Sequence, residues 1–404
     1  MENQEFNESR RHFLKNSVSG IAGTALLPEV FKSDEKSIKK KKTKIIYRTL
    51  GKTNIKLPII GMGVMNVDNP ALVEAALDAG IVLLDTAHGY QRGRNEEMIG
   101  KVIKNRPRDS YVIATKVLGN NEDRKTGLFT KSTRPGLFIE QFETSLKRLG
   151  LEYVDILHLH SVVRRESALF EPLLNALVKL KKEGKTRFIG LSTHRNEPEV
   201  IKATQDSNVY DVVLTAYNFR QPHRAEMEKA IESAAKAGLG IIAMKTQAAV
   251  YWDKQRTKQI NMKAALKWVL QNENIHTTIP GFTTFDQLKL DISIMEDLTL
   301  TEKEKSDLNS IKKLSDGLYC SQCGRCQTQC PAGIDIPTLM RTYMYAYGYR
   351  NLSLAKDTLQ SLRLSLIPCT NCPTCNVKCS MGFNIRDRIL DITRLQNIPE
   401  DFLV

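Results

Sequence analysis

The sequence predicts an α/β fold: a (β/α)8 TIM barrel with an N-terminal β-hairpin, followed by a small, mainly helical domain. Short apolar segments rich in branched side chains alternate with longer segments of helical periodicity, which is typical of a parallel sheet covered by helices. Several of the apolar segments end on an ionisable residue, as strands do at a catalytic rim. Cysteine is absent before residue 320 and frequent after it, which indicates a second domain.

Residues 45–300 are expected to form the barrel. The segments KIIYRTL and IKLPII flank a Gly-Lys-Thr-Asn turn and are expected to pair as the hairpin. Helices are expected between the strands, for example at 138–149 and 226–237, so that eight strands and eight helices close the barrel. The expected strands are 59–61, 82–85, 111–115, 155–159, 188–191, 212–216, 240–244 and 277–280.

Three successive strands end on Asp85, Lys116 and His160, and a short loop after the first of them leads to Tyr90. In a (β/α)8 barrel the carboxyl ends of the strands form the face that carries catalytic residues. Taken singly, such an Asp is usually a helix cap, such a Lys is usually solvated, and such a His is usually a core residue. Together and in this order they favour an enzyme.

The strings LDTAHGY, ATK and DILHLH resemble three motifs of the aldo-keto reductase family: DTAxxY, a lysine strand, and a histidine five residues after an aspartate. The resemblance covers about residues 46–300. It implies that Asp85, Tyr90, Lys116 and His160 form the catalytic tetrad of that family. It also implies a reaction that interconverts a carbonyl and an alcohol by hydride transfer with a nicotinamide cofactor, NADP or NAD.

Each residue of this set has a chemical role. A carbonyl that accepts hydride needs a proton donor at the developing alkoxide, and a free tyrosine, with a pKa of about 10, gives up its proton reluctantly. We expect the Lys116 ammonium to lower the pKa of Tyr90 and Asp85 to hold Lys116 by an ion pair. We expect His160 to donate a hydrogen bond that orients the substrate oxygen.

The later strand ends would bind the cofactor if the resemblance holds. Ser192 matches the first residue of a Ser-Asn pair that contacts the nicotinamide, and Thr193 replaces the second. Leu214 stands where a glutamine is common, and Met244 stands where an aromatic ring is common. The cofactor-binding candidates are Ser192, Thr193, Met244, Lys245, Gly281, Thr283 and Gln287.

The phosphate side of this expected site departs from the family pattern. The positions of its Lys, Ser and Arg fall on Gly281, Phe282 and Gln287. Losing the arginine removes a bidentate phosphate clamp, so the choice between NADP and NAD stays open. Backbone amides from Gly281 to Thr284, at a helix start, are alternative phosphate ligands.

The eight cysteines form two runs with the spacing Cx2Cx2Cx3C, and each cysteine is displaced by 49 positions from its counterpart. The residues that follow also correspond, CPAGIDI against CSMGFNI, which indicates an internal duplication. The first run, followed by Pro331, matches the pattern of bacterial ferredoxins. The runs are Cys320, Cys323, Cys326 and Cys330, and Cys369, Cys372, Cys375 and Cys379.

This resemblance to ferredoxins implies two 4Fe-4S clusters in a helical ferredoxin-like domain, residues 301–404, with helices expected in PTLMRTYMYAY and LAKDTLQSLRLSL. In two-cluster ferredoxins the fourth cysteine of a run binds the other cluster. One cluster would therefore be held by Cys320, Cys323, Cys326 and Cys379, and the other by Cys369, Cys372, Cys375 and Cys330. Disulfides and zinc are the alternatives, and the repeated four-cysteine spacing favours clusters over both.

Residues 1–44 are expected to be a twin-arginine signal and a basic linker. Arg10 and Arg11 precede FLK and the mildly apolar SVSGIAGTALL, which resembles the signal that exports folded proteins. No A-x-A cleavage site follows, and the lysines up to Lys44 indicate a charged tether. We expect export to the periplasm, with a cytoplasmic protein as the alternative.

The composition limits the classes of partner. The 404 residues are 41% hydrophobic without a run of 18 apolar residues, so we expect two or more domains and no transmembrane segment. The net charge is +14, but aromatic residues are not interleaved with the lysines, so we expect a solvated surface and no nucleic-acid partner. The expected partners are a small-molecule carbonyl or alcohol substrate and, as a candidate, an electron-transfer protein.

The two domains pose a problem of electron number. A nicotinamide transfers two electrons together as hydride, whereas each cluster takes one, and the sequence has no flavin signature. The clusters are therefore expected to serve electron transfer to a partner or structure. The alternative function is an iron-sulfur electron-transfer or redox-sensing protein on a catalytically inactive barrel.

Overall fold

The computed structural model describes residues 45–123, 126–221, 223–247, 261–312, 319–320, 322–362, 364, 369–372 and 375–403. The twin-arginine motif and the lysine-rich tether lie outside the described residues. Residues 44–404 form one compact unit. Within the described ranges, no helix combines the length and apolar character that a membrane crossing requires.

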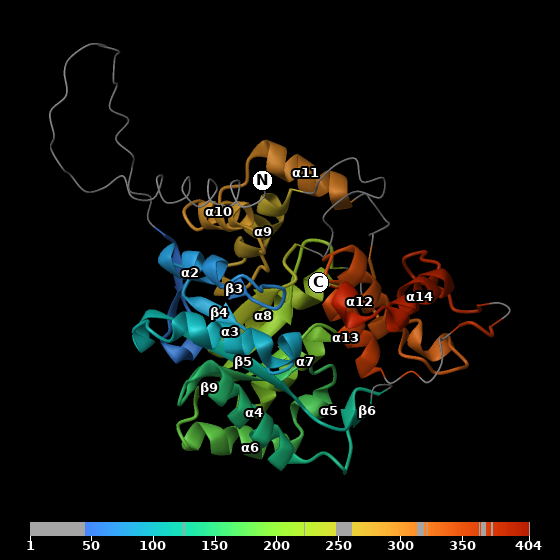
Figure 1. The fold of residues 1–404 in the computed structure, drawn as a ribbon. Helices are drawn as coiled ribbons and strands as arrows, with labels where there is room; N and C mark the ends of the chain where they lie inside the picture. The colour runs from blue at the N-terminus through green and yellow to red at the C-terminus, as the bar shows by residue number, and fades with distance from the viewer. Residues whose placement is uncertain are drawn as a thin grey trace, which may run out of the picture. The chain divides into compact units, whose positions relative to one another are not determined.

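Eight parallel strands form the barrel, as predicted (Figure 1). They follow one another around the sheet in sequence order, and a parallel bridge between Ile60 and Thr278 joins the first edge to the last. The strands are β3 (Met62–Gly63), β4 (Leu83–Asp85), β5 (Val112–Leu118), β8 (Val154–His160), β9 (Thr186–Thr193), β10 (Val212–Ala216), β11 (Gly240–Met244) and β12 (Thr277–Thr278). The first strand begins later than the predicted 59–61, but those residues still join the last strand, because Ile59 accepts the amide hydrogen bond of Thr278 and Gly61 donates its amide to Thr278.

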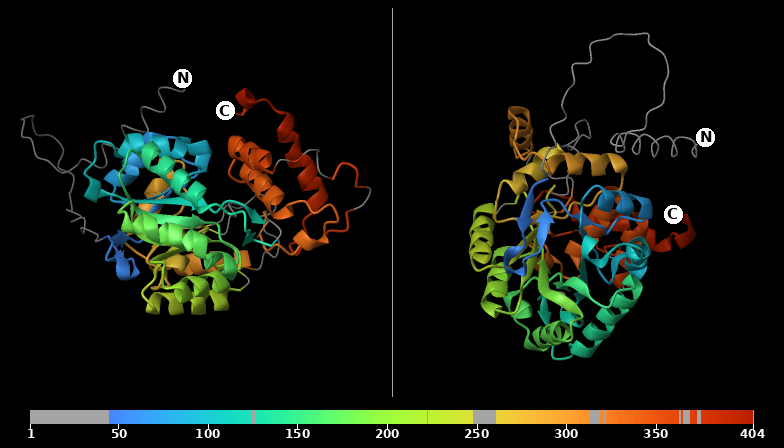
Figure 2. Two further views of the ribbon diagram at one scale, coloured as in Figure 1. Left: turned by 90° about the horizontal axis from the view of Figure 1, so that it is seen from below. Right: turned by 90° about the vertical axis from the view of Figure 1, so that its left-hand side faces the viewer.

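One helix follows each barrel strand, and the helices surround the strands (Figure 2, right). Helix α4 shows how the sequence sets an element: Pro135 occupies its first position, Phe138 and Phe142 face the core, and Gly150 ends it with a φ of 66°. The eight helices are α2 (Pro70–Asp78), α3 (Arg94–Ile103), α4 (Pro135–Leu149), α6 (Glu171–Lys182), α7 (Glu197–Ser207), α8 (Arg224–Lys236), α9 (Met262–Leu270) and α10 (Phe285–Ile294).

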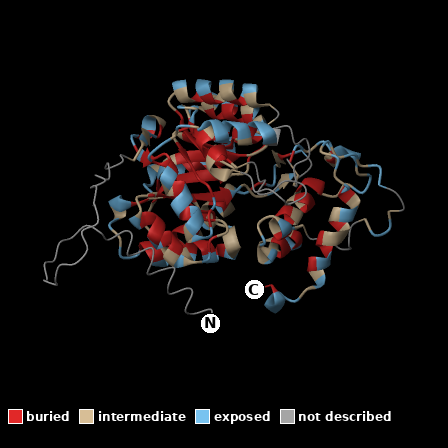
Figure 3. Cartoon of the chain, turned by 90° about the horizontal axis from the view of Figure 1, so that it is seen from above, coloured by how far each residue is buried: buried red, intermediate tan, exposed pale blue. Residues whose placement is uncertain are grey.

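The predicted hairpin, β1 (Tyr47–Thr49) and β2 (Lys56–Pro58), closes the amino-terminal end of the barrel. Its Leu50 and Leu57 are fully buried and pack with Leu83 and Leu214, which come from barrel strands. At Gly240 a Cβ atom would lie 2.6 Å from Cγ of Leu50, so this close approach requires glycine. Figure 3 shows the buried residues concentrated in the strands.

Several elements were not predicted. The loop after β5 contains a small hairpin, β6 (Glu122–Asp123) and β7 (Leu128–Phe129), and the loop after β8 contains α5 (Arg165–Ala168). Helix α11 (Glu302–Lys312) follows the expected boundary at residue 300, yet it packs on α9: Nζ of the buried Lys267 lies 3.2 Å from Oε2 of Glu304. Short 3-10 helices lie at Gly51–Thr53, Tyr90–Gly93, Arg108–Ser110, Gln327–Gln329, Arg394–Asn397 and Glu400–Phe402.

The C-terminal domain is helical, as expected. Helices α12 (Ile336–Tyr347), α13 (Leu352–Ser361) and α14 (Ile385–Thr393) enclose a core with buried Leu339, Leu359 and Ile389. The duplication is visible in the fold: α12 and α14 begin 49 residues apart and pack on each other. Asp335 and Asn384, in equivalent positions, accept the amide hydrogen bond that caps each helix.

Candidate active site

The barrel brings the four residues of the predicted tetrad to one rim. Asp85 is the last residue of β4, Lys116 lies near the end of β5, and His160 is the last residue of β8. These three strands are neighbours in the sheet, so their carboxyl ends lie together. Tyr90 begins the 3-10 helix η2 (Tyr90–Gly93), in the loop after β4.

Lys116 lies at the centre of this group. Its Nζ donates hydrogen bonds to Oδ1 of Asp85 at 2.5 Å and to the carbonyl oxygen of Thr86 at 2.6 Å. The same Nζ lies 3.3 Å from Oη of Tyr90 and 4.9 Å from the centre of its ring. Lys116 and Asp85 are each only 2% exposed, so this ion pair is removed from solvent. The arrangement puts a cation next to the phenol that would have to donate a proton.

Burial works against every charge in this group. Burial lowers the pKa of Lys116, but Asp85 and Tyr90 together raise it more, so the amine stays protonated. Burial raises the pKa of Asp85, and Lys116 offsets part of that rise. Burial also raises the pKa of Tyr90, and Lys116 offsets only part of it. The expected influence of Lys116 is therefore present, because its charge and its hydrogen bond lower the pKa of Tyr90, but desolvation is larger and the net pKa is raised.

His160 is a neutral imidazole next to Tyr90. The two rings are 6.0 Å apart and nearly perpendicular, at 79°. Burial, followed by the charge of Lys116, holds the pKa of His160 well below its ordinary value. His158, two residues earlier on the strand, is fully buried against Gly190, where a Cβ atom would lie 2.2 Å from Nδ1 of His158. A neutral His160 has one N–H to donate, which suits hydrogen bonding to a substrate oxygen.

A layer of polar residues behind the tetrad fixes the strand ends. Thr86 Oγ1 donates to Asn95 Oδ1 at 2.6 Å, and Thr115 Oγ1 donates to Glu96 Oε1 at 2.7 Å. Nη1 of Arg148 lies 3.3 Å from Oε2 of Glu96. Asn95 and Glu96 are fully buried at the start of α3. These residues were not predicted from the sequence; the signal that could have revealed them is Glu96, a charged residue on the buried face of α3, where it needs a partner.

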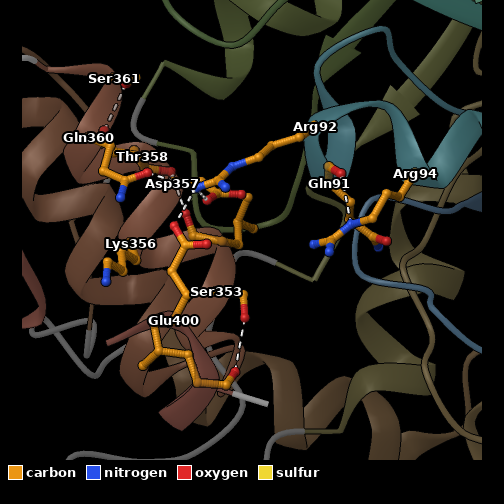
Figure 4. A network of polar contacts seen from close by, with 12 residues as sticks. Gln91, Arg92, Arg94, Ser353, Lys356, Asp357, Thr358, Gln360, Ser361 and Glu400 are labelled. Atoms are coloured by element: carbon orange, nitrogen blue, oxygen red, sulfur yellow. Dashed lines mark hydrogen bonds and ion pairs between the residues drawn. The ribbon is translucent and has the colours of Figure 1, made fainter. Parts of the chain in front are cut away.

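The loop that carries Tyr90 is strained and held from two sides. Gln91 and Arg92 both have left-handed backbone conformations, with φ values of 50° and 55°. Nε2 of Gln91 donates to two carbonyl oxygens in the loop after β3. Arg92 reaches the C-terminal domain, where it forms ion pairs with Asp357 and Glu400 and donates to Gln360 (Figure 4). The C-terminal domain thus contacts the active-site loop directly.

The cofactor-binding candidates lie on the remaining part of the rim. Ser192 and Thr193 end β9, Met244 ends β11, and Lys245 follows it with a φ of 53°. Gly281 and Thr283 follow β12, and Gln287 lies in the first turn of α10.

Some of these candidates already have partners. Ser192 Oγ accepts a hydrogen bond from the amide of Ser161 at 2.8 Å, and its hydroxyl hydrogen stays free to donate to a carboxamide. Thr193 Oγ1 donates to the carbonyl of Arg195. Gln287 Oε1 accepts from the amide of Thr283 at 2.8 Å, so that amide is satisfied within the chain.

Lys245 is the one cation among the predicted cofactor-binding residues. None of the hydrogen bonds and ion pairs of the described residues involves its amine. Burial, followed by the charge of Arg341, lowers its pKa to about 8. Glu197 opposes this change but forms no ion pair with Lys245, and a half-buried cation without an ion pair fits the phosphates of a dinucleotide.

The structure also contains a cavity of about 580 Å³ outside this rim. It is lined by residues of α3 and α4, including Lys101, Lys104 and Lys147, and by none of the four tetrad residues. It does not contribute to the site described here.

The eight cysteines are free and form two groups. Burial, followed by its neighbour Cys320 among others, raises the pKa of Cys326 to about 11, and Cys323 and Cys379 add to the rise. Burial, followed by Cys372, Cys375 and Cys330, likewise raises the pKa of Cys369 to about 11. The thiols that act on Cys326 and on Cys369 thus come in each case from the same run and from the fourth position of the other run, as in the sets that the ferredoxin resemblance implies. Among the described residues, no three His, Cys, Asp or Glu side chains converge on a point where a single metal ion would bind.

Hydrogen bonds join the two cysteine runs across the duplication. Cys323 Sγ lies 3.2 Å from Oγ of Ser380, next to Cys379. The amide of Gln329 exchanges two hydrogen bonds with the backbone of Lys378, at 2.7 and 3.3 Å. Burial opposes the ionisation of Cys323, but its hydrogen bonds with Ser380 and Arg325 outweigh burial and lower its pKa to about 7. Ligation of iron needs the thiolate, so these contacts favour it at Cys323.

Comparison with known proteins agrees with both domains. Residues 60–264 match the aldo/keto reductase family, and residues 319–384 match a 4Fe-4S dicluster domain. L-galactose dehydrogenase from Arabidopsis thaliana is 27% identical over 310 residues, which cover 67% of this chain and 95% of that protein. NADH-specific methylglyoxal reductase from Escherichia coli is 33% identical over 165 residues, which cover 35% of this chain and 50% of that protein.

Solved structures show the same fold. Aldo-keto reductase AKR11C1 from Bacillus halodurans superposes with a TM-score of 0.54 at 23% identity, covering 66% of this chain and 96% of that one. An aldo/keto reductase from Klebsiella pneumoniae, solved with NADP and acetate, gives 0.52 at 20% identity, with 66% and 95% covered. The family match spans residues 60–264, half of the 404-residue chain, and all four tetrad residues lie within it, so the chain belongs to the aldo/keto reductase family.

Proposed function

We propose that this oxidoreductase interconverts a carbonyl and an alcohol by hydride transfer with NADP or NAD. The observation that carries the proposal is the position of Lys116, whose amine is 2.5 Å from Asp85 and 3.3 Å from the phenol oxygen of Tyr90. The nicotinamide, when bound, supplies or accepts the hydride. Ser192, Met244 and Lys245, at the strand ends beside the tetrad, would hold it.

The residues of this chain handle the proton. In the direction of reduction, the carbonyl carbon gains a hydride, the C=O π bond breaks, and the oxygen takes a proton from Oη of Tyr90. The protonated Lys116 stabilises the phenolate that is left, and Asp85 keeps Lys116 protonated and in place. His160 donates a hydrogen bond to the same oxygen, because its neutral ring keeps one N–H. In oxidation, Tyr90 accepts the proton.

Replacing Tyr90 by Phe tests the proposal. We expect Tyr90→Phe to lower kcat for an aromatic aldehyde by roughly 100- to 10,000-fold, the range of general acid catalysis, while binding of NADPH or NADH stays intact. The control is Tyr47→Phe, because Tyr47 is an exposed tyrosine on β1. If the wild type binds neither nucleotide under anaerobic conditions, the alternative of an inactive barrel with a redox domain is correct.

We also propose that the C-terminal domain binds two 4Fe-4S clusters, one held by Cys320, Cys323, Cys326 and Cys379 and the other by Cys369, Cys372, Cys375 and Cys330. The grouping of the thiols supports these sets. Iron and acid-labile sulfide analysis should give about eight of each per chain, from the two sets of four. Cys323→Ser and Cys379→Ser should alter the same cluster by electron paramagnetic resonance, and alteration of different clusters would refute the crossed arrangement.

We propose, from residues 1–44 alone, that the folded protein is exported by the twin-arginine route. Replacing Arg10 and Arg11 together by lysine should retain the protein in the cytoplasm of a bacterial host. Equal periplasmic amounts of both forms would contradict export by this route.

A further inference from the structure

Helix α12 of the C-terminal domain faces the rim that carries the tetrad. Nη1 of Arg341 lies 3.5 Å from Nε2 of His194, the residue that follows β9. Tyr345, four residues further on and therefore on the same face of the helix, acts electrostatically on Tyr90. Just beyond α12, Asn351 lies 3.4 Å from Asn66 in the loop after β3. One face of α12 is thus directed at the substrate side of the tetrad.

Arg341 has no counter-ion among the described residues. The hydrogen-bond partners of its guanidinium within the described ranges are neutral: Nε2 of His194 at 3.5 Å and Oγ1 of Thr338 at 3.0 Å. Burial, followed by neighbouring charges that include Lys245 and Arg341, keeps the pKa of His194 well below its ordinary value, so the ring is neutral. A half-buried guanidinium with spare donors and no carboxylate partner favours an anion from outside the chain.

The nearby carboxylates are engaged elsewhere. Glu197 accepts a hydrogen bond from Gln221 at 3.1 Å and contacts His223 at 3.0 Å. Asp335 caps α12 by accepting from the amide and hydroxyl of Thr338. Neither carboxylate forms an ion pair with Arg341; Glu197 acts electrostatically on Lys245, and Asp335 acts on Arg195.

Two other cations, Arg195 and Lys245, lie near this rim. Nη1 of Arg195 lies 3.8 Å from the Cβ position of Gly324, in the loop between Cys323 and Cys326. Among the charges that act on Lys245, those of Arg341 and Glu197 precede that of Cys320. Arg341 also lies towards the reacting group: the His194 ring that it contacts is 3.5 Å from Oγ of Ser161, the residue after His160, and the charge of Arg341 acts on His160. The anion that Arg341 contacts would therefore be on the molecule that also contacts His160.

We propose that Arg341 recognises an anionic group of the substrate, a carboxylate or a phosphate, and that the C-terminal domain thereby supplies part of the substrate specificity of the barrel. The planar guanidinium suits either group, because both accept two parallel hydrogen bonds. The inference rests on the proposed carbonyl chemistry. The substrate class is then a small carbonyl compound, or the corresponding alcohol, with a negative charge a short distance from the reacting carbon.

Matched pairs of substrates test this assignment in the complete, cluster-loaded protein. The carboxylate pair is 4-carboxybenzaldehyde and methyl 4-formylbenzoate, and the phosphate pair is glyceraldehyde 3-phosphate and glyceraldehyde. In one of the two pairs, the one whose anionic group matches that of the natural substrate, we expect Arg341→Met to reduce the preference for the anionic member. The ratio of the two kcat/KM values should fall by roughly 10- to 100-fold, mainly through a higher KM for the anionic member. Arg341→Lys should restore part of the preference. Arg394→Met, an exposed arginine of the same domain, is the control and should leave the preference unchanged.

Three results would overturn the proposal. The preference could stay the same in Arg341→Met, both members could weaken equally, or affinity for NADPH could fall instead, which would assign the anion to the cofactor. Calorimetric titration of 4-carboxybenzaldehyde and glyceraldehyde 3-phosphate, without nucleotide, separates this proposal from the proposed function. Binding that Arg341→Met weakens supports Arg341 even if no nucleotide sustains turnover, and binding that it leaves unchanged refutes the assignment.

Discussion

Replacing Arg92 by Met should loosen the loop that carries Tyr90. Arg92 forms an ion pair with Asp357, lies 3.3 Å from Oε1 of Glu400 and donates to Oε1 of Gln360 at 2.6 Å (Figure 4). Its side chain is 49% exposed, so the ion pair with Asp357 contributes only about 0.2–1 kcal/mol, and the hydrogen bond contributes about 1 kcal/mol. These two contacts together stabilise the loop by about 1–2 kcal/mol.

The stabilisation by the contacts of Arg92 matters because the backbone of the loop is strained. A non-glycine residue with left-handed backbone geometry costs about 1–3 kcal/mol, and Gln91 and Arg92 both have such geometry. The contacts and the strain are therefore of the same order, and removing the contacts should let the loop relax and displace Tyr90. We expect Arg92→Met to lower kcat by roughly 3- to 30-fold, since about 1.4 kcal/mol corresponds to a factor of ten.

A double-mutant cycle with Asp357→Asn separates this contact from other effects of the substitution. Steady-state kcat should show a coupling of about 0.5–1 kcal/mol between the two positions. Raising the salt concentration from about 0.1 M to about 1 M should move the wild type towards Arg92→Met, because screening shortens from about 10 Å to about 3 Å. The control is Arg106→Met, which removes a surface ion pair with Asp78. If kcat is the same in the wild type, both single variants and the double variant, the C-terminal domain does not hold this loop.

The remaining predictions concern buried groups. Asp85→Asn should lower kcat by roughly 100-fold and shift the alkaline limb of the pH profile of kcat to lower pH. The shift is expected because Lys116 loses the carboxylate that raises the pKa of its amine. An alkaline limb at the same pH as in the wild type would contradict this role of Asp85. Burial raises the pKa of Asp291 to about 8, so the folded state retains a proton that the unfolded state releases above about pH 4, and stability should be lost as the pH rises from there through about 8. Asp291→Asn should abolish that loss in urea titrations, and an unchanged pH dependence would assign it to other groups. Gly190→Ala places a Cβ atom 2.2 Å from the buried His158 ring and should destabilise the fold by about 1–3 kcal/mol in the same assay, whereas an unaffected midpoint would show that the ring can move.

Much of the barrel follows from local pattern. The strands β10 and β11 match the predicted ranges 212–216 and 240–244, because buried parallel strands are continuous apolar runs with clear ends. Once the strands are parallel and in order, their carboxyl ends must share a rim, so the approach of Lys116 to Asp85 was predictable. The small hairpin β6–β7 was not, because two-residue strands have too few residues for a periodic signal.

The net pKa of Tyr90 needed the coordinates, because it is the difference between two opposing influences. The sequence indicates that Lys116 is near, but it does not measure how completely the phenol is desolvated. The same limit applies to His160 and His158, which look alike in the sequence although one faces the rim and the other packs on Gly190.

The sequence by itself determined the barrel, the identity of its rim residues and the duplication of the cysteine runs. The strands and their last residues show in short local segments, and the duplication shows in a repeated cysteine spacing. Only the tertiary structure decided that the C-terminal domain contacts the active site, through Arg92 in the catalytic loop and Arg341 opposite His194, which is 147 positions away in the chain. Contacts between domains depend on complementary charge and shape between two surfaces. They need no periodic pattern of apolar residues in either domain, so no such pattern in the sequence predicts them.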